Sequence, residues 1–369
     1  MSTIDEQIRE IEEQIRRTQK NKATEHHIGL LKAKLAKLRR KKIEDQFSAK
    51  SSGGKGFDVK KSGDGTVVLI GFPSCGKSTL ISKITNKESR VGDYAFTTTE
   101  AIPGIMEHRG TKIQIIDLPG IIEGASLGKG RGREILAVAR SADLILLMLD
   151  PFESEYYYNV IMNELYKVGI RPGKERPNIK IKKTDRGGIA LSVLHPLTKI
   201  TEHTFKSILR EYKVMNAIVT VKCDPTIDEV IDFLQENRVY PKLLIVINKI
   251  DLISKEELNK LKEQFPDALF VSALNGENLN RLKDAIVEKL DLMTIYLKKQ
   301  GQKADFDEPM VIKRGSTIKD VCRKIHRKFV ENFRYAVITG PSAKYPNQRF
   351  GLDHVVEEGD IITIVVKKF

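Results

Sequence analysis

A glycine-rich segment, GFPSCGKST at 71–79, has the residue types and spacing needed to hold a phosphate chain. It fits G-x-x-x-x-G-K-[ST] and lies between an apolar run and LISKIT, so we expect a strand, a loop and a helix in that order. Glycines let backbone N–H groups curl around phosphates, and the helix N-terminus favours an anion. Lys77 would reach the β- and γ-phosphates, and the Ser78 hydroxyl would bind Mg²⁺. The expected phosphate-binding residues are Gly71, Ser74, Cys75, Gly76, Lys77, Ser78 and Thr79, with Cys75 as a small filler rather than a reactive thiol.

Two later segments could close on the metal and the terminal phosphate. DLPG at 117–120 ends an apolar run, where Asp117 can hold Mg²⁺ through water and the Gly120 N–H can meet the γ-phosphate. FTTTE at 96–100 offers a threonine for the same metal; Thr98 is our choice, with its two neighbouring threonines as alternatives. The expected metal ligands are therefore Ser78, Thr98 and Asp117, and the expected catalytic residues are Lys77, Thr98 and Gly120.

A further pair of segments would recognise the base. In NKID at 248–251, the Asp251 carboxylate can accept from N1–H and from the 2-amino group of guanine. Adenine lacks both donors and would leave that carboxylate unpaired, which is a strong penalty. Asn248 and Lys249 would brace the loops, and the Ala273 N–H of Ser272–Leu274 would meet the guanine carbonyl. We expect GTP as substrate and GDP as product; an ATPase is the alternative.

Composition restricts the setting. The chain has 369 residues and a net charge of +14. A positive field of this size favours a polyanionic partner, either nucleic acid or an anionic membrane, and the alternative is a basic surface that only keeps the protein soluble. No run approaches the roughly 20 apolar residues of a membrane span, and the N-terminus does not resemble a signal peptide. The three cysteines are far apart, which argues against disulfides and a CxxC metal site. A reducing, cytoplasmic setting is expected.

The remaining pattern predicts an α/β core with three additions. Short apolar runs rich in β-branched residues are typical of strands buried on both faces of a parallel sheet. They occur at 67–72, 113–118, 144–149, 243–247 and 269–271. The gap between the third and fourth runs is too long for one crossover, and the apolar stripe at 227–234 predicts the crossover helix. The expected domains are a helical hairpin at 1–50, a P-loop domain at 62–151 and 225–290, an inserted α+β subdomain at 152–224, and a β-grasp domain at 291–369.

These features resemble a known family. YAFTTT before DLPGIIEGAS, with its GKGRG tail, is similar to the Obg group of GTPases. The whole chain resembles the developmentally regulated GTP-binding proteins, and PMVIKRGSTIKDVCRKIH resembles a TGS domain, a β-grasp module. The resemblance implies an α/β P-loop GTPase fold with the additions above and slow GTP hydrolysis. It also implies ribosome binding and a zinc-finger-containing regulatory partner.

Two residues bear on catalysis. Many GTPases have a glutamine after DxxG that orients the attacking water, whereas this chain has Ile121, so we expect slow hydrolysis that needs a cation or a partner. Relatives with an apolar residue there often use K⁺ with help from a P-loop asparagine; Ser74 stands at that place, which leaves the use of K⁺ open.

The basic segments at 32–42, 171–186 and 313–328 are candidate contacts to rRNA or tRNA, with solvated helix faces as the alternative. RNA is preferred to a membrane because the basic helix lacks Trp or Phe on its apolar side. The preferred function is a GTPase switch on the ribosome. The alternative is an assembly scaffold in which the nucleotide is structural.

Overall fold

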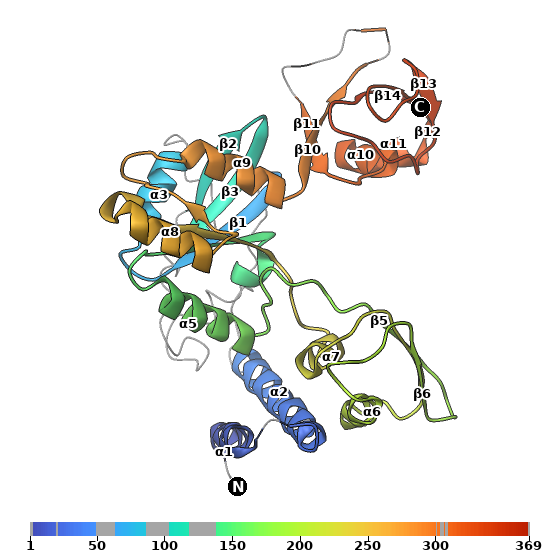
Figure 1. The fold of residues 1–369 in the computed structure, drawn as a ribbon. Coiled ribbons are helices and arrows are strands. Elements are labelled where there is room, and N and C mark those ends of the chain that lie inside the picture. Colours follow the sequence, from blue (N-terminus) through green and yellow to red (C-terminus); the bar gives the residue numbers. More distant parts are fainter. Residues whose placement is uncertain are drawn as a thin grey trace. The chain divides into compact units, whose positions relative to one another are not determined.

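The computed structural model describes residues 3–19, 21–48, 63–85, 103–117, 138–299, 301–302, 306 and 309–367 (Figure 1). The chain forms two compact units. Unit 1 comprises Met1–Phe57, Gly124–Leu136 and Met162–Pro241, and unit 2 comprises Asp58–Glu123, Ala137–Ile161 and Lys242–Phe369.

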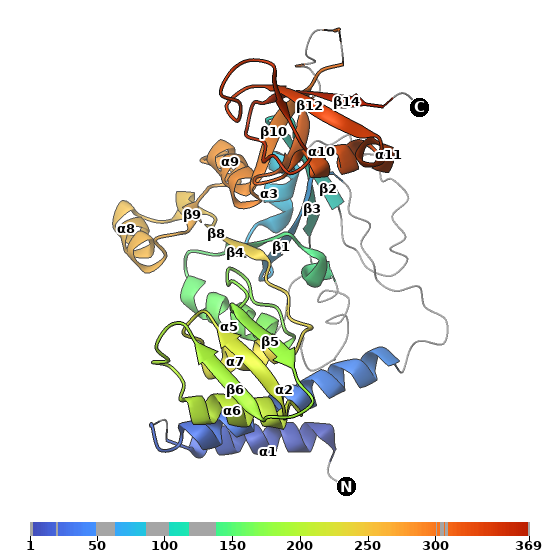
Figure 2. The same ribbon diagram turned by 90° about the vertical axis from the view of Figure 1, so that its right-hand side faces the viewer.

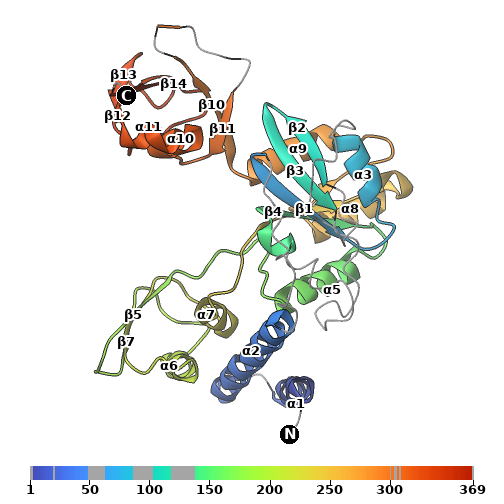
Figure 3. The same cartoon turned by 180° about the vertical axis from the view of Figure 1, so that it is seen from behind.

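Unit 2 contains a six-stranded sheet in the order β2-β3-β1-β4-β8-β9. Figure 3 shows its strands β2, β3, β1 and β4. Neighbouring strands are parallel except for β2, which pairs antiparallel with β3 at the edge. The strands are β1 (Gly65–Gly71), β2 (Pro103–His108), β3 (Thr111–Asp117), β4 (Leu144–Leu149), β8 (Lys242–Ile247) and β9 (Leu269–Phe270). The carboxyl ends of the parallel strands share one edge, which is where open α/β sheets bind ligands.

The central strands are apolar on both faces because both faces are covered. Every residue of β1 and of β4 is buried. Leu80 on one helix and Leu282 on another share a single core with Val67 and Leu146 of these strands. The helices that follow strands of this sheet are α3 (Lys77–Ile84), α5 (Ser154–Lys167), the 3-10 turn η2 (Ile250–Leu252), α8 (Lys255–Gln264) and α9 (Leu279–Lys289).

A five-stranded sheet closes unit 2 at its C-terminal end, in the order β11-β10-β14-β12-β13. Its first and last long strands, β10 and β14, are parallel neighbours, and the other pairings are antiparallel, which is the β-grasp arrangement. Val321 and Cys322 of the covering helix pack into its core. The elements are β10 (Leu292–Leu297), β11 (Met310–Lys313), α10 (Ile318–Ile325), α11 (Arg327–Glu331), β12 (Phe333–Thr339), β13 (Gln348–Phe350) and β14 (Ile361–Val366).

Unit 1 combines a helical hairpin with a three-stranded sheet, β5-β7-β6 (Figure 2). A capping box starts the first helix, in which Thr3 and Glu6 satisfy each other's backbone N–H groups. Ala33 of the second helix lies in the core with Phe205 and Val219. The elements are α1 (Ile4–Arg17), α2 (Glu25–Ser48), β5 (Ile179–Lys183), β6 (Ile189–Val193), α6 (Glu202–Glu211), β7 (Ala217–Val221) and α7 (Ile227–Leu234).

The helix α7 differs from the expectation. Its apolar stripe predicts a crossover helix on the nucleotide-binding sheet. Instead, Val230 and Ile231 pack with Phe205 in the core of unit 1. An apolar stripe shows that one helix face is buried, but it does not say against which element it packs. The strands β2, β5, β10 and β13 were not expected either. Three of them, β2, β5 and β13, are edge strands, and β5 (IKIKK) is also rich in lysine, whereas β10 is an inner strand of its sheet.

Candidate functional site

The loop after β1 takes a shape that its glycines make possible. A Cβ on Gly71 would lie 2.5 Å from the Met148 carbonyl oxygen and 2.9 Å from Cys75 Sγ. Gly76 has φ +96°, and a Cβ there would lie 2.4 Å from Asn248 Nδ2. Ser74 is also left-handed, with φ +64°. Such backbone turns N–H groups toward one concave side, which is the geometry of an anion nest.

Lys77 is held at this concavity. It is the first residue of α3 and is buried, and its Nζ donates to the carbonyl oxygens of Gly71 and Phe72, both at 2.9 Å. A buried ammonium must have acceptors, and without a phosphate the loop carbonyls supply them. Ser78 and Thr79 follow in the first turn of the helix and are exposed, so both hydroxyls are accessible.

Asp117 ends β3 beside this lysine and has an unmet acceptor. Its Oδ1 is buried with no hydrogen-bond partner among the described residues. Burial raises the pKa of Asp117, and the charge of Lys77 opposes that rise. An orphaned carboxylate oxygen and the accessible Ser78 hydroxyl are hard oxygen donors of the kind that Mg²⁺ prefers. These residues fit a bound Mg²⁺, which would neutralise phosphate charge there.

Asn248 connects the phosphate loop to the base-recognition loop. It is 3% exposed; its Nδ2 donates to the Cys75 carbonyl at 2.9 Å, and its Oδ1 accepts from the Ala273 N–H at 2.9 Å. The motif predicts that the Ala273 N–H meets guanine, but in the structure this N–H already donates to Asn248. The difference arises because a side chain 25 positions away reaches the loop, which no local pattern reveals.

The other base-recognition residues lie around this bridge. Lys249 has φ +62° and its Nζ pairs with Asp150 Oδ2 at 2.8 Å. Asp251 and Leu274 are exposed, so the carboxylate that should read guanine is accessible, whereas Ser272 is fully buried in the loop. Sequence reasoning missed Asp150. The available signal was its position directly after β4, comparable to that of Asp117 at the end of β3.

Some expected residues cannot be placed. Thr98, Gly120 and Ile121 lie outside the described residues. Cys75 is 2% exposed and packs in the core, and burial raises the pKa of its thiol, as suits a filler rather than a nucleophile. Within the described ranges, no three His, Cys, Asp or Glu side chains gather as a metal cluster, and no helix is long and apolar enough to span a membrane.

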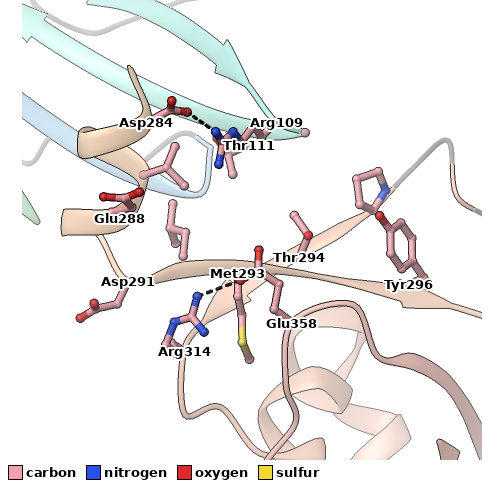
Figure 4. Close-up of a pocket in the computed structure, with 14 residues that line it drawn as sticks. Arg109, Thr111, Asp284, Glu288, Asp291, Met293, Thr294, Tyr296, Arg314 and Glu358 are labelled. Carbon is pink, nitrogen blue, oxygen red and sulfur yellow. Dashed lines mark hydrogen bonds and ion pairs between the residues drawn. The ribbon is translucent and has the colours of Figure 1, made fainter. Parts of the chain in front are cut away.

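A cavity of about 610 Å³ lies in unit 2 away from these motifs (Figure 4). It is lined by the β2–β3 turn, α9 and the β10–β11 hairpin. Its charged side chains largely satisfy one another: Arg109 pairs with Asp284 and Arg314 with Glu358, each at 2.8 Å. None of the expected nucleotide-binding residues lines it.

Comparison with known proteins agrees with this geometry. Family models match at residues 66–183 ("50S ribosome-binding GTPase"), 186–292 ("C-terminal region of MMR_HSR1 domain") and 293–366 ("TGS domain"). An uncharacterized GTP-binding protein of Methanocaldococcus jannaschii is 53% identical over 369 residues, covering 99% of this chain and 93% of its own.

Two further relatives carry the family's name. Developmentally-regulated GTP-binding protein 2 of Homo sapiens is 49% identical, and its homolog in Dictyostelium discoideum is 46% identical. Both alignments span 362 residues, 98% of this chain and 99% of the relative. The chain therefore belongs to the family of developmentally regulated GTP-binding proteins, and it is a GTP-binding protein with a P-loop GTPase domain and a C-terminal TGS domain.

Proposed function

We propose that this protein hydrolyses GTP slowly and acts as a ribosome-associated switch in cytoplasmic translation. The observation that carries the catalytic part is the arrangement around Asn248, which ties the phosphate loop to the base-recognition loop. In this proposal Lys77 leaves the loop carbonyls for the β- and γ-phosphates. Ser78 and Asp117 hold Mg²⁺, and the segments with Thr98 and Gly120 order around the γ-phosphate and relax after hydrolysis.

The slow rate follows from Ile121, which has no group to orient water. The test is single-turnover hydrolysis with saturating GTP and Mg²⁺, in K⁺ and in Na⁺ at equal ionic strength. We expect turnover above the Lys77→Ala control, and a faster rate in K⁺ if this cation replaces the missing group despite Ser74. Turnover equal to that of Lys77→Ala in both salts would favour the scaffold instead.

Guanine specificity is proposed to depend on Asp251, whose exposed carboxylate can accept two hydrogen bonds from the base edge. Asp251→Asn presents an amide to the same edge, which suits xanthine better than guanine. We expect this variant to lose GTP affinity and gain affinity for xanthosine triphosphate. An unchanged preference, measured by competition against labelled GDP, would instead support the ATPase alternative.

The proposal of ribosome binding depends on basic side chains that are free to contact RNA. The ion pairs of the described residues distinguish the candidate segments. Five of the seven basic residues at 32–42 pair with carboxylates of described residues in unit 1, for example Lys37 with Glu211. In contrast, Lys180, Lys182 and Lys183 on the edge strand β5 are exposed and make no ion pair with a described residue. Free lysines on one strand suit phosphate contacts, and the matching family model is described as a 50S ribosome-binding GTPase.

Ribosome binding should therefore weaken steeply with salt. Replacing Lys180, Lys182 and Lys183 together with glutamine should reduce the salt slope by up to about three, the number of phosphate contacts removed. Neutralising the basic residues at 32–42 is the comparison, and we expect a smaller effect because most are already paired. A flat salt response in cosedimentation would refute the RNA contact. We also propose, from the family resemblance, a zinc-finger-containing regulatory partner; copurification from the native source tests it.

A further inference from the structure

Unit 1 contains a cavity of about 520 Å³, and none of the expected nucleotide-binding residues lines it. Its lining residues come from α1 and α2, from the C-terminal end of α5 and the segment that follows, and from α7 and the residues that flank it. They include Leu35 and Arg39 of α2, Tyr166, Lys174, Ile231 and Tyr240. All of its lining residues belong to unit 1.

One wall of the cavity holds a buried cluster with more positive than negative charge. The Asp232 carboxylate lies between two guanidinium groups, Arg171 (Nε at 2.5 Å, Nη2 at 2.7 Å) and Arg238 (Nε at 2.8 Å). All three side chains are more than nine-tenths buried. One carboxylate cannot balance two arginines, and buried charge without a counter-charge is costly. The cluster therefore favours a further anion.

The two arginines differ in how many donors remain. Arg171 is satisfied, because its Nη1 also donates to the carbonyl oxygens of Tyr166 and Ile170. Arg238 uses only Nε; its two terminal nitrogens make no hydrogen bond to the described part of the chain. A guanidinium has five N–H donors, so four remain on Arg238, which lines the cavity.

Two more donors line the same cavity. The Tyr240 hydroxyl is buried and has no partner among the described residues, and the charges of Asp232, Arg171 and Arg238 all act on it. The Lys174 ammonium lies over the Tyr166 ring, 5.2 Å from its centroid, and makes no ion pair with a described carboxylate. The buried Tyr240 hydroxyl has no acceptor, which is uncommon in folded proteins and needs an explanation, whereas the Lys174 ammonium is exposed and interacts with Tyr166.

Most carboxylates that line the cavity are bound elsewhere and do not pair with these positive groups. Asp228 pairs with Lys32 and Glu12 with Arg39, each at 2.6 Å. Glu229 accepts from the Thr226 backbone and hydroxyl as part of a helix cap, and Glu175 is exposed. Within the buried cluster, Arg171 and Arg238 thus share the single carboxylate of Asp232, an excess of one positive charge. Lys174 adds a second cation at the exposed edge of the cavity, where the charge of Glu229 also acts on it.

We propose that this cavity binds a phosphate group through Arg238, Lys174 and Tyr240. A phosphate carries several acceptor oxygens and no obligatory donor, and it matches both the excess charge and the three donors. The group could come from free phosphate or from the backbone of an RNA; both present the same oxygens, and the experiment separates them.

The experiment uses the full chain saturated with GDP and Mg²⁺, so that the phosphate loop is occupied. Inorganic phosphate is titrated against chloride at constant ionic strength, and a hexauridylate without terminal phosphates is titrated in parallel, both by calorimetry. We expect saturable binding of at least one probe. Binding of phosphate alone indicates the free anion, and binding of the oligonucleotide indicates an RNA backbone.

Variants then test the residues. Lys174→Gln, which leaves the Asp232 cluster intact, and Arg238→Gln should each weaken binding about tenfold or more, as loss of a charge-assisted hydrogen bond predicts. Lys206→Gln on α6, outside the cavity, should not change it. Tyr240→Phe should leave the melting temperature of the free protein unchanged or raised, yet weaken probe binding. No saturable binding of either probe, or binding unchanged by Lys174→Gln, would overturn the proposal.

Discussion

The bridge made by Asn248 leads to a quantitative prediction for Asn248→Ala. The change removes both hydrogen bonds and leaves the Cys75 carbonyl and the Ala273 N–H without their partner, in surroundings where Cys75 is 2% and Ala273 1% exposed. An unsatisfied buried group costs about 1–3 kcal/mol, so the loops should lose about 2–6 kcal/mol of local stability. If about 2 kcal/mol of this must be restored on binding, GDP affinity falls about thirtyfold.

The assay is GDP titration together with amide hydrogen exchange at Ala273, which reports the lost bond directly. Asn275→Ala is the matched control, because Asn275 is exposed in the same loop and only its backbone N–H is bonded, to Ser272 Oγ. Asn248→Asp tests the two hydrogen bonds separately. It keeps an acceptor for the Ala273 N–H but places a carboxylate against the Cys75 carbonyl, so the affinity for GDP should still fall. If Asn248→Ala and Asn275→Ala have equal effects on GDP affinity and exchange, the bridge does not stabilise the site.

Three further predictions concern single positions. Gly76→Ala should cost at least about 1 kcal/mol more than Gly276→Ala in urea unfolding, because both are left-handed but only a Cβ at position 76 meets Asn248. Burial raises the pKa of Asp117, so the folded state holds its proton more tightly than the unfolded state. Without Mg²⁺, the melting temperature should therefore fall as pH rises from the ordinary aspartate pKa through the raised one. Asp117→Asn should abolish this fall, and a fall that persists in the variant would show that Asp117 is not its cause. Asp232→Ala should lower the free energy of unfolding by about 3–5 kcal/mol, because it leaves two arginines buried without their counter-charge. Asp228→Ala removes a more exposed ion pair and should lower it by at most about 1 kcal/mol. Equal losses in the two variants would contradict the role given to Asp232.

Local sequence determined much of the nucleotide-binding sheet. The runs at 144–149 and 243–247 are strands within a residue of the expected ends, because parallel strands covered on both faces must be apolar throughout. The phosphate-loop motif was recognised from local sequence alone. The structure adds why its glycines are required: Gly71 closely approaches the Met148 carbonyl, and Gly76 has a positive φ. The edge strands β2 and β5 were not predicted, because an edge strand is not enclosed on all sides by the core and therefore lacks a continuous apolar run.

Tertiary structure decided what depends on residues far apart in the chain. The stripe of α7 predicted a buried face, but only the fold placed Val230 in the core of unit 1. The Ala273 N–H could be assigned to guanine from its motif, whereas the structure gives it to Asn248. The basic segment 171–186 was a candidate RNA contact, yet its first residue, Arg171, is buried against Asp232, 61 positions away. Sequence patterns record which side chains prefer to be buried or charged; which partner satisfies each one is settled only when distant segments are brought together.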